Sequence, residues 1–334
     1  MTKVIVGITI GDPAGIGPEI VVKALSKPEI YDVCRPVVIG DLKLLKHTTQ
    51  QLKLDMALRT IENPRETSGK TSVIEVIDLK NVDLERLRIG ETSKEAGKAS
   101  IEYIEVAVRH ALNRELDAIA TAPINKESIN LAGSPHIGHT ELIGALTNTK
   151  EPITMFWVRG VLIFFLTRHL SLKEAIRAVK KGRILASTVK IDSILRQMGF
   201  EKPRIAIAAL NPHASDGGLM GDEEKREIIP AVKELREKGI NAIGPVSADA
   251  VFHQAFSGKY DAVLSLYHDQ GHIPAKTVDF YGTVSVTLNL PFVRTSVDHG
   301  TAYEIAGKGV ANSKSMEEAI RAAAELTIKF KRKP

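Results

Sequence analysis

The sequence predicts an α/β fold with a largely parallel sheet and helices on its faces. Short apolar runs alternate with stretches of helical spacing along most of the 334 residues, and this alternation is typical of parallel β-α-β units. The length is sufficient for two domains or for one large one. Because no low-complexity linker or Pro/Gly/Ser-rich boundary interrupts the pattern, we expect any second domain to be inserted into the first.

The predicted strands are short apolar runs bounded by turn residues. They span 4–9, 36–39, 73–77, 117–121, 153–158, 161–166, 204–210, 261–266 and 284–288. Arg159-Gly160 predicts an antiparallel hairpin between the fifth and sixth runs. The predicted helices span 19–25, 42–54, 94–112, 172–179, 187–198, 222–238, 248–256 and 316–330. Pro18 suits the start of the first helix, and Pro230 is expected to kink or split the helix that contains it.

Composition excludes several classes of protein. Hydrophobic residues make up 43% of the chain and charged residues 25%, so a packed core is feasible. Cys34 is the single cysteine, which rules out an intrachain disulfide and a thiolate metal cluster and fits a reducing cytoplasm. The first nine residues lead straight into a strand without the apolar region of a signal peptide, and the apolar run 161–166 is too short to cross a bilayer. We therefore expect a cytoplasmic protein with no membrane partner.

Charge favours a small anionic ligand over a nucleic acid. The net charge is +5 and the isoelectric point about 9.1. Charges of both signs are mixed along the chain, and only the tail 329–333 clusters positive residues. We read that tail as a solvated end and expect no nucleic-acid partner.

The densest chemistry lies in residues 267–276. His268, Asp269, Gln270, His272 and Lys276 follow the apolar run 261–266, and ligands of open α/β sheets bind at the carboxyl ends of strands. The glycine and proline at positions 271 and 274 predict that the segment continues neither as strand nor as helix. The alternative is a polar surface turn.

Two further histidines, His169 and His213, also follow strongly apolar strands. With His268 they form a trio that a shared sheet would bring together. Three protein ligands with open positions are the pattern of a catalytic metal site, and Asp249 and Asp269 are candidates to orient the ligands or to join the metal. Taken singly, each histidine also fits a structural role.

Three other stretches are candidate anion sites. The glycine-rich loop 11–19 precedes a helix, but it lacks the dinucleotide fingerprint and the phosphate-loop lysine; the alternative is a tight connection. Thr140 is a candidate N-cap beside His139, where free N–H groups would hold a phosphate or carboxylate; the alternative is a capping motif with an incidental histidine. Arg294 offers a planar fork for either anion, and the glycines of 299–312 allow a flat ligand to approach the backbone.

Together these stretches resemble the 4-hydroxythreonine-4-phosphate dehydrogenase family over the full length of the chain. The motifs that carry the resemblance are the segments 11–19, 138–141, 210–213, 267–271 and 294–302. The segment 299–312 is also similar to the adenosine-binding loop of isopropylmalate and isocitrate dehydrogenases. The resemblance implies their two-domain α/β/α architecture with an active site in the interdomain cleft. We expect residues 1–125 with 270–334 to form the cofactor-side domain, and residues 126–269 to form an inserted domain for metal binding and dimerisation.

The resemblance also implies the roles of individual residues. The metal ligands would be His169, His213 and His268, and the homodimer would draw ligands from both subunits. The remaining implied contacts are with the substrate, from His139, Thr140, Lys276, Ser285 and Arg294, and with the cofactor, from His299, Gly300, Thr301, Ala302, Gly307 and Asn312. Ser285 stands where the family usually has an asparagine, so one substrate hydrogen bond is expected to be weaker or lost.

His272 distinguishes two branches of the family. The vitamin B6 biosynthetic enzymes usually have Leu-Pro at this point, whereas this chain has His272-Ile273-Pro274, which resembles the branch acting on D-threonate or D-erythronate 4-phosphate. The implied reaction is NAD- and metal-dependent oxidation of the 3-hydroxyl followed by decarboxylation to dihydroxyacetone phosphate. The metal would be zinc, cobalt, manganese or magnesium. The candidate bases are Lys276, Asp249 and Asp269.

Several alternatives stay open at this stage. Within the family, the substrate is alternatively 4-phosphohydroxy-L-threonine or an aromatic cis-dihydrodiol, and NADP is not excluded. From other classes, a metal-dependent hydrolase would turn over without a nicotinamide, and a metabolite-binding protein would turn over nothing.

Overall fold

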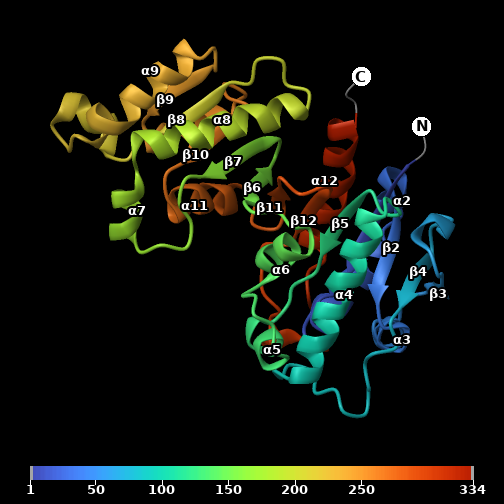
Figure 1. The fold of residues 1–334 in the computed structure, drawn as a ribbon. Helices are drawn as coiled ribbons and strands as arrows, with labels where there is room; N and C mark the ends of the chain where they lie inside the picture. The colour runs from blue at the N-terminus through green and yellow to red at the C-terminus, as the bar shows by residue number, and fades with distance from the viewer. Residues whose placement is uncertain (1–2, 332–334) are drawn as a thin grey trace. The chain divides into compact units, whose positions relative to one another are not determined.

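The computed structural model describes residues 3–331, which divide into two compact units (Figure 1). Unit 1 comprises Met1–Ile153 and Val284–Ile328, and unit 2 comprises Thr154–Thr283 with residues 329–334. By its internal contacts, the chain passes from one unit to the other after Ile153 and again after Thr283. Residues 1–2 and 332–334, which include the last two residues of the predicted basic tail 329–333, lie outside the described part.

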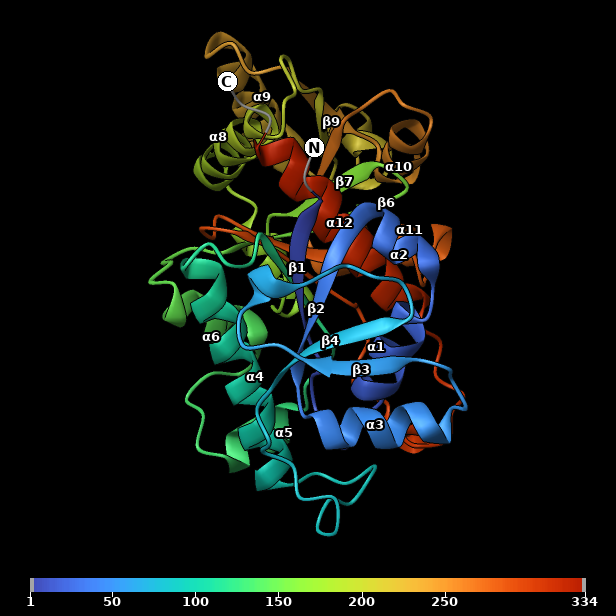
Figure 2. The ribbon, with the colours of Figure 1, turned by 90° about the vertical axis from the view of Figure 1, so that its right-hand side faces the viewer.

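Unit 1 is built on a sheet with the strand order β3-β4-β2-β1-β5-β12-β11. Figure 2 shows the part formed by β1, β2, β4 and β3. Every neighbouring pair is parallel except β11 and β12, which are antiparallel. The strands span Val4–Thr9 (β1), Cys34–Gly40 (β2), Ala57–Thr60 (β3), Val73–Asp78 (β4), Ala118–Thr121 (β5), Val284–Leu288 (β11) and Val293–Ser296 (β12). β12 had no counterpart among the predicted strands, because its Arg-Thr-Ser is polar although all four residues are buried.

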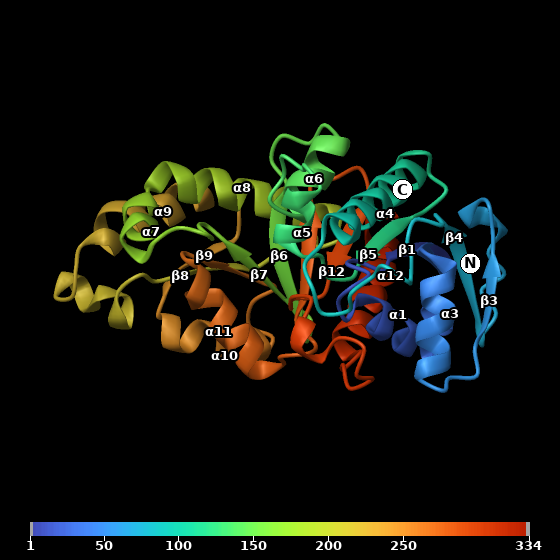
Figure 3. The same cartoon turned by 90° about the horizontal axis from the view of Figure 1, so that it is seen from below.

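Helices cover both faces of this sheet. Figure 3 shows α4 on one face, with α1 and α12 on the other. The helices span Gly17–Leu25 (α1), Pro28–Val33 (α2), Leu42–Gln51 (α3), Lys94–Leu112 (α4), Lys126–Leu131 (α5), His139–Leu146 (α6) and Lys314–Lys331 (α12). Side-chain caps set the starts of the longer ones: Asp41 accepts the Leu44 N–H at α3, and Ser93 accepts the Ala96 N–H at α4.

Unit 2 has the strand order β6-β7-β10-β8-β9. The strands span Ile153–Val158 (β6), Val161–Phe165 (β7), Ile205–Ala208 (β8), Ala242–Val246 (β9) and Ala262–Ser265 (β10). β6 and β7 form the predicted antiparallel hairpin, and Arg159 and Gly160 supply the two positive φ angles of its turn (45° and 83°). From β7 onward, each neighbouring pair is parallel.

The helices of unit 2 also lie on both faces of the sheet, with α8 and α9 opposite α10 and α11 (Figure 3). They span Leu172–Ala178 (α7), Lys181–Gln197 (α8), Ile229–Glu237 (α9), Ala248–Phe256 (α10) and His268–Val278 (α11). The helix predicted from residue 222 is split, as expected at Pro230: a π-helical turn, Glu224–Ile228, precedes α9. A core cluster including Phe156, Ile163, Phe252 and Val263 packs between the sheet and α10.

Helix α11 corrects the prediction for the histidine-rich segment, which Gly271 and Pro274 were expected to keep non-helical. Gly271 permits the helix because it lets the backbone approach the sheet: a Cβ there would lie 2.4 Å from Ser265 Oγ and 2.6 Å from Phe165 Cε1. Gln270 then fastens the first turn, accepting the Leu266 N–H and donating to the Ala209 carbonyl, both at 2.7 Å. These contacts with the strand ends outweigh the hydrogen bond that Pro274 cannot donate.

No helix within residues 3–331 is both long and apolar enough to cross a membrane.

Candidate functional site

The three candidate metal ligands follow three neighbouring parallel strands of unit 2. His169 comes after β7, His268 after β10 and His213 after β8, and these strands are adjacent in the order β7-β10-β8. Because carboxyl ends of parallel strands meet at one edge, the histidines belong to one edge of the sheet, which we call the histidine edge. The rings of His169 and His268 are 6.0 Å apart between centroids.

His268 is oriented by its neighbours. Its Nδ1 lies 2.6 Å from Asp269 Oδ1. A proton on Nδ1 would be donated to this carboxylate, and Nε2 would then be the nitrogen with a lone pair for a ligand. The ring of His272 stacks on it at 3.5 Å, with 12° between the planes, and packs in turn against Phe156 and Phe165. The carboxylate of Asp269 is thus the polar group in contact with the His268 ring.

His213 lies at the same edge beside Asp249, in a turn of unusual backbone. The turn Pro212–Gly218 is entered through Asn211, and His213 has φ 52° and ψ 31°, in the left-handed region. Hydrogen bonding from Ser247 is the main cause that lowers the pKa of Asp249, and the charge of His213 lowers it further. Among residues 3–331, no group of three or more His, Cys, Asp or Glu side chains is close enough together to hold a metal ion.

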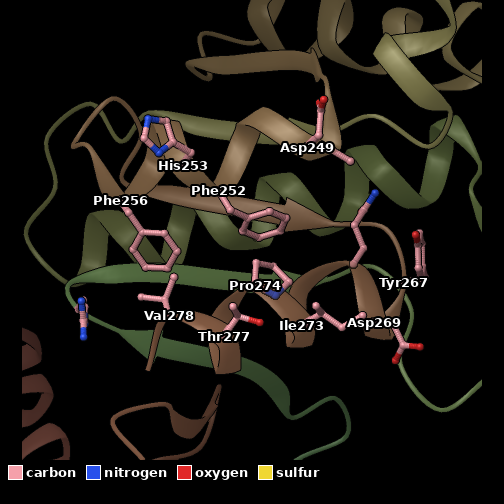
Figure 4. A pocket seen from close by; sticks show the side chains of 13 residues that line it. Asp249, Phe252, His253, Phe256, Tyr267, Asp269, Ile273, Pro274, Thr277 and Val278 are labelled. Carbon is pink, nitrogen blue, oxygen red and sulfur yellow. The ribbon is translucent and has the colours of Figure 1, made fainter. Parts of the chain in front are cut away.

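A pocket of about 780 Å³ opens beside the histidine edge, between α10 and α11. Figure 4 shows Asp249, Tyr267 and Asp269 toward one end, with Phe256 and Val278 toward the other. The two carboxylates therefore lie toward one end of the pocket, while His253 lies beside Phe256 toward the other. Lys276, a candidate base, lies on α11 with its Nζ 5.5 Å from the centroid of Phe280.

Unit 1 holds the candidate anion-binding residues in its interior. Arg294 lies on β12 and is only 3% exposed. Its guanidinium donates to Thr287 Oγ1 at 3.1 Å and to Thr121 Oγ1 at 2.6 Å, while its buried Nε has no hydrogen-bond partner within the described chain. Burial lowers the pKa of Arg294 to about 10, against an opposing effect of Glu141, so the group stays cationic at neutral pH.

His139 lies close to this arginine. Its Nε2 is also buried without a hydrogen-bond partner in residues 3–331, and its pKa lies well below the usual value because of burial and, next, repulsion by Arg294. A neutral imidazole and a cationic guanidinium therefore share one interior region. Thr140 is the second residue of α6 and not its N-cap, which is Gly138. Because glycine has no side chain, no cap side chain accepts the N–H groups of the first turn. Ser285 lies on β11, two residues before Thr287 and on the same face.

The glycine-rich loop 11–19 is the tight connection that the sequence allowed. A Cβ at Gly11 would lie 2.3 Å from the Pro123 carbonyl oxygen, and one at Gly17 would lie 2.0 Å from that of Ile10. Asp12 turns its carboxylate inward, accepting the Ala14 N–H at 2.8 Å and the Tyr303 hydroxyl at 2.9 Å. Burial raises the pKa of Asp12. This pair joins residues far apart in the sequence, and no local pattern marks it.

Residues of α1 bind the candidate cofactor loop, which comprises residues 299–312. Glu19, 4% exposed, accepts the Ala311 N–H at 2.7 Å and the Gly309 N–H at 3.2 Å. Lys23 pairs with Glu19 and donates to the carbonyls of the same two residues. Thr301 accepts the Ile16 N–H through its carbonyl. The loop is thus fixed at several points.

A pocket of about 270 Å³ lies between this loop and α3. Of the predicted cofactor residues, Gly307 lines it. Ala302 adopts a left-handed turn, His299 bonds the Gly300 carbonyl, and Asn312 accepts the Lys314 N–H, so these residues shape the loop. His47 and Gln51 also line the pocket and were not predicted; with Leu44 and Thr48 they occupy one face of α3, a spacing the sequence does contain.

Comparison with known proteins places these features in one family. Residues 32–323 match the family model described as pyridoxal phosphate biosynthetic protein PdxA. The chain is 50% identical over 328 residues to a protein of Halalkalibacterium halodurans named "Putative D-threonate 4-phosphate dehydrogenase", covering 98% of each. A Clostridium botulinum protein of the same name is 48% identical over 99% of each chain.

The crystal structure of a 4-hydroxythreonine-4-phosphate dehydrogenase from Klebsiella pneumoniae is similar in fold as well, with a TM-score of 0.89 at 41% identity over 98% of each chain. The chain therefore belongs to the family of the pyridoxal phosphate biosynthetic protein PdxA, and it is a dehydrogenase that acts on a CH–OH group.

Proposed function

We propose that this enzyme oxidises D-threonate or D-erythronate 4-phosphate with NAD and a divalent metal, releasing CO2 and dihydroxyacetone phosphate. The observation that carries the proposal is the interior of unit 1, where Arg294 and His139 present buried nitrogens without hydrogen-bond partners in the described chain. Buried polar groups are normally paired, so these nitrogens favour an anionic ligand. The names of the 48–50% identical relatives support the same substrate class.

In this proposal the substrate is held by its charged ends. Arg294 binds the phosphate or carboxylate through its planar fork, already oriented by Thr121 and Thr287. His139, being neutral, donates one N–H without adding a second buried charge. Thr140 and Ser285 supply hydroxyls from α6 and β11. Such positioning sets the carbon that loses hydride against the nicotinamide.

The histidine edge would hold the metal. Imidazoles backed by carboxylates suit zinc, cobalt and manganese, and the contact of His268 Nδ1 with Asp269 would leave Nε2 of His268 to bind the cation. When bound, the cation supplies a Lewis acid for the substrate hydroxyl. Lys276, Asp249 and Asp269 are the candidate proton acceptors. Because the described chain does not gather three ligands by itself, we propose that a second copy completes the set in a homodimer.

The pocket beside the loop 301–311 would hold the adenosine part of the cofactor. None of the described residues that line it is lysine or arginine, so the 2′-phosphate of NADP would have no cationic partner there. This composition favours NAD. His299, Gly300, Thr301, Ala302, Gly307 and Asn312 are proposed to present or shape the loop that contacts it.

The second candidate substrate is 4-phosphohydroxy-L-threonine, favoured by the solved relatives of the Klebsiella type. NADH formation, measured with a divalent metal supplied, separates the two: the three substrates are compared at equal concentration. We expect turnover of the two sugar acids and little of the amino acid. Turnover of the amino acid alone would identify 4-phosphohydroxy-L-threonine as the substrate. Release of phosphate without NADH would indicate a hydrolase.

A further inference from the structure

We propose that Glu224 is a positioning residue that holds the turn bearing His213 in its left-handed conformation. The inference rests on the proposed metal site at the histidine edge. It starts from two observations of unit 2 that the proposed reaction does not use, namely a run of unusual backbone angles and a buried carboxylate directly behind it.

The backbone of this turn is unfavourable for the residues that form it. His213, Ala214, Ser215 and Asp216 have φ angles of 52°, 55°, 65° and 43°, followed by Gly217 at 72°. L-residues rarely adopt such angles in succession, because Cβ crowds the following carbonyl. Such a run persists only where surrounding contacts determine it, and such strain concentrates at functional sites.

Glu224 provides those contacts. It is fully buried, and its Oε1 accepts the backbone N–H groups of Leu210 at 2.8 Å and Asn211 at 2.7 Å. Its Oε2 accepts the Asn211 side-chain amide at 2.8 Å. One carboxylate therefore receives three N–H groups from the two residues that lead into the turn, and it fixes the direction in which the chain enters Pro212 and His213.

The surrounding chain is shaped to bring Glu224 there. Glu224 begins the π-helical turn Glu224–Ile228, a rare conformation that is frequent at functional sites. Gly221 permits close passage, since a Cβ there would lie 2.6 Å from Asn211 Nδ2. The preceding residue, Glu223, contacts the same amide at 2.8 Å, but it is half-buried and accepts no backbone N–H of the 210–211 segment.

The substitution Glu224→Gln tests the role with little change in volume. A glutamine has one acceptor oxygen where glutamate has two, so at least one of the three N–H groups loses its acceptor while buried. We expect the turn to relax and His213 to leave the position in which it contributes to metal binding. Loss of a residue that orients a ligand typically lowers metal affinity about 10- to 100-fold.

The experiment is a titration of the full-length metal-free protein with Co²⁺, followed by its visible absorption, together with thermal unfolding in the absence of metal. Wild type, Glu224→Gln and the matched control Glu223→Gln are compared. We expect Glu224→Gln to bind Co²⁺ about 10- to 100-fold more weakly, with Glu223→Gln within about threefold of wild type. If Glu224→Gln does not fold, Asn211→Ser removes the side-chain half of the contact, and a several-fold loss of affinity is expected instead.

The outcomes separate this inference from the proposed function. If wild type binds Co²⁺ and the folded Glu224→Gln binds it equally well, Glu224 does not position His213 and the inference is wrong, while the metal site stands. A lower melting temperature with unchanged Co²⁺ affinity would give Glu224 a merely structural role and would likewise overturn the inference. If wild type itself binds no Co²⁺, the proposed metal site fails, and the inference fails with it.

Discussion

Two regions carry the candidate chemistry of this enzyme, and they differ in how far their polar groups are withdrawn from solvent. In unit 1, Arg294 is 3% exposed and Asp12 is fully buried. At the histidine edge of unit 2, the side chain of His268 is 40% exposed and that of Asp269 is 69% exposed. Unit 1 thus holds its polar groups in the interior, whereas the histidine edge presents its candidate ligands at the surface.

The difference follows from the ligands that each region is proposed to bind. A substrate anion is recognised best by charged donors that are already oriented and dehydrated, as Arg294 is by two threonines. A site that a second subunit completes must keep its ligands accessible. In unit 2 the buried groups lie behind the candidate ligands. Buried Glu224 binds the segment that leads into His213, and buried Phe156 packs against the ring of His272.

Removing a surface ligand should have the largest effect on turnover. His213→Ala is expected to lower metal-dependent kcat by about a thousandfold or more, because a catalytic metal supplies several kcal/mol of stabilisation and each ~1.4 kcal/mol is a factor of about ten. The exposed ring should contribute little to stability, so the thermal unfolding curve should not shift. His253→Ala is the matched control on α10. Full activity of His213→Ala would show that the histidine edge is not catalytic.

Substitution of the buried cation Arg294 should have the second-largest effect on turnover. Arg294→Lys keeps the charge but loses the planar fork, so kcat/KM for the phosphorylated substrate should fall about 100-fold, while KM for NAD stays within about twofold. Steady-state kinetics with each substrate varied in turn makes the measurement. If only KM for NAD changed, Arg294 would belong to the cofactor site and not to the substrate site.

Weakening the hydrogen bonds between Glu19 and the candidate cofactor loop should have a smaller effect on turnover. Glu19→Gln weakens the charge-assisted bonds to the N–H groups of Gly309 and Ala311, and we expect KM for NAD to rise about tenfold with kcat nearly unchanged. Glu29→Gln, at an exposed position of α2, is the control. If Glu19→Gln altered kcat and left KM for NAD unchanged, the pocket beside the loop would not be the cofactor site.

The smallest effect concerns pH and stability. The pKa of His139 is depressed in the folded protein, so below its ordinary value of about 6.5 the unfolded chain binds a proton that the folded chain does not. Stability therefore falls as pH drops through that value. Between pH 7.5 and pH 5.5, the urea concentration at the unfolding midpoint should decrease more for wild type than for His139→Asn. Equal decreases would mean that His139 is not held neutral by burial.

Much of this fold follows from its pattern of apolar runs, and two of the exceptions share a physical cause. β1 and the β6–β7 hairpin are as predicted, and Pro230 splits its helix, whereas β3, β9 and β12 were not predicted. At α11 and β12, tertiary contacts override local signals: α11 forms through the close approach of Gly271 and the hydrogen bonds of Gln270, and β12 buries polar residues against β5 and β11.

Some residues of the candidate site can be predicted from local sequence, and others depend on contacts between distant segments. Histidines that follow apolar strands can be read from the sequence, because strand ends of a parallel sheet meet at one edge. Glu224 cannot be assigned in this way, since its partners lie 13 and 14 residues earlier across a turn that no local rule predicts. The same holds for Asp12 and Tyr303, which are 291 residues apart.

Chelation tests whether the surface histidines and the interior donors serve one metal-dependent oxidation. Protein dialysed against EDTA is assayed for NADH formation from D-threonate 4-phosphate, before and after addition of Zn²⁺, Co²⁺ or Mn²⁺. We predict that turnover disappears on chelation and returns with a divalent cation in wild type, but not in His213→Ala. NADH formation that continues unchanged in the chelated protein would show that the oxidation needs no metal.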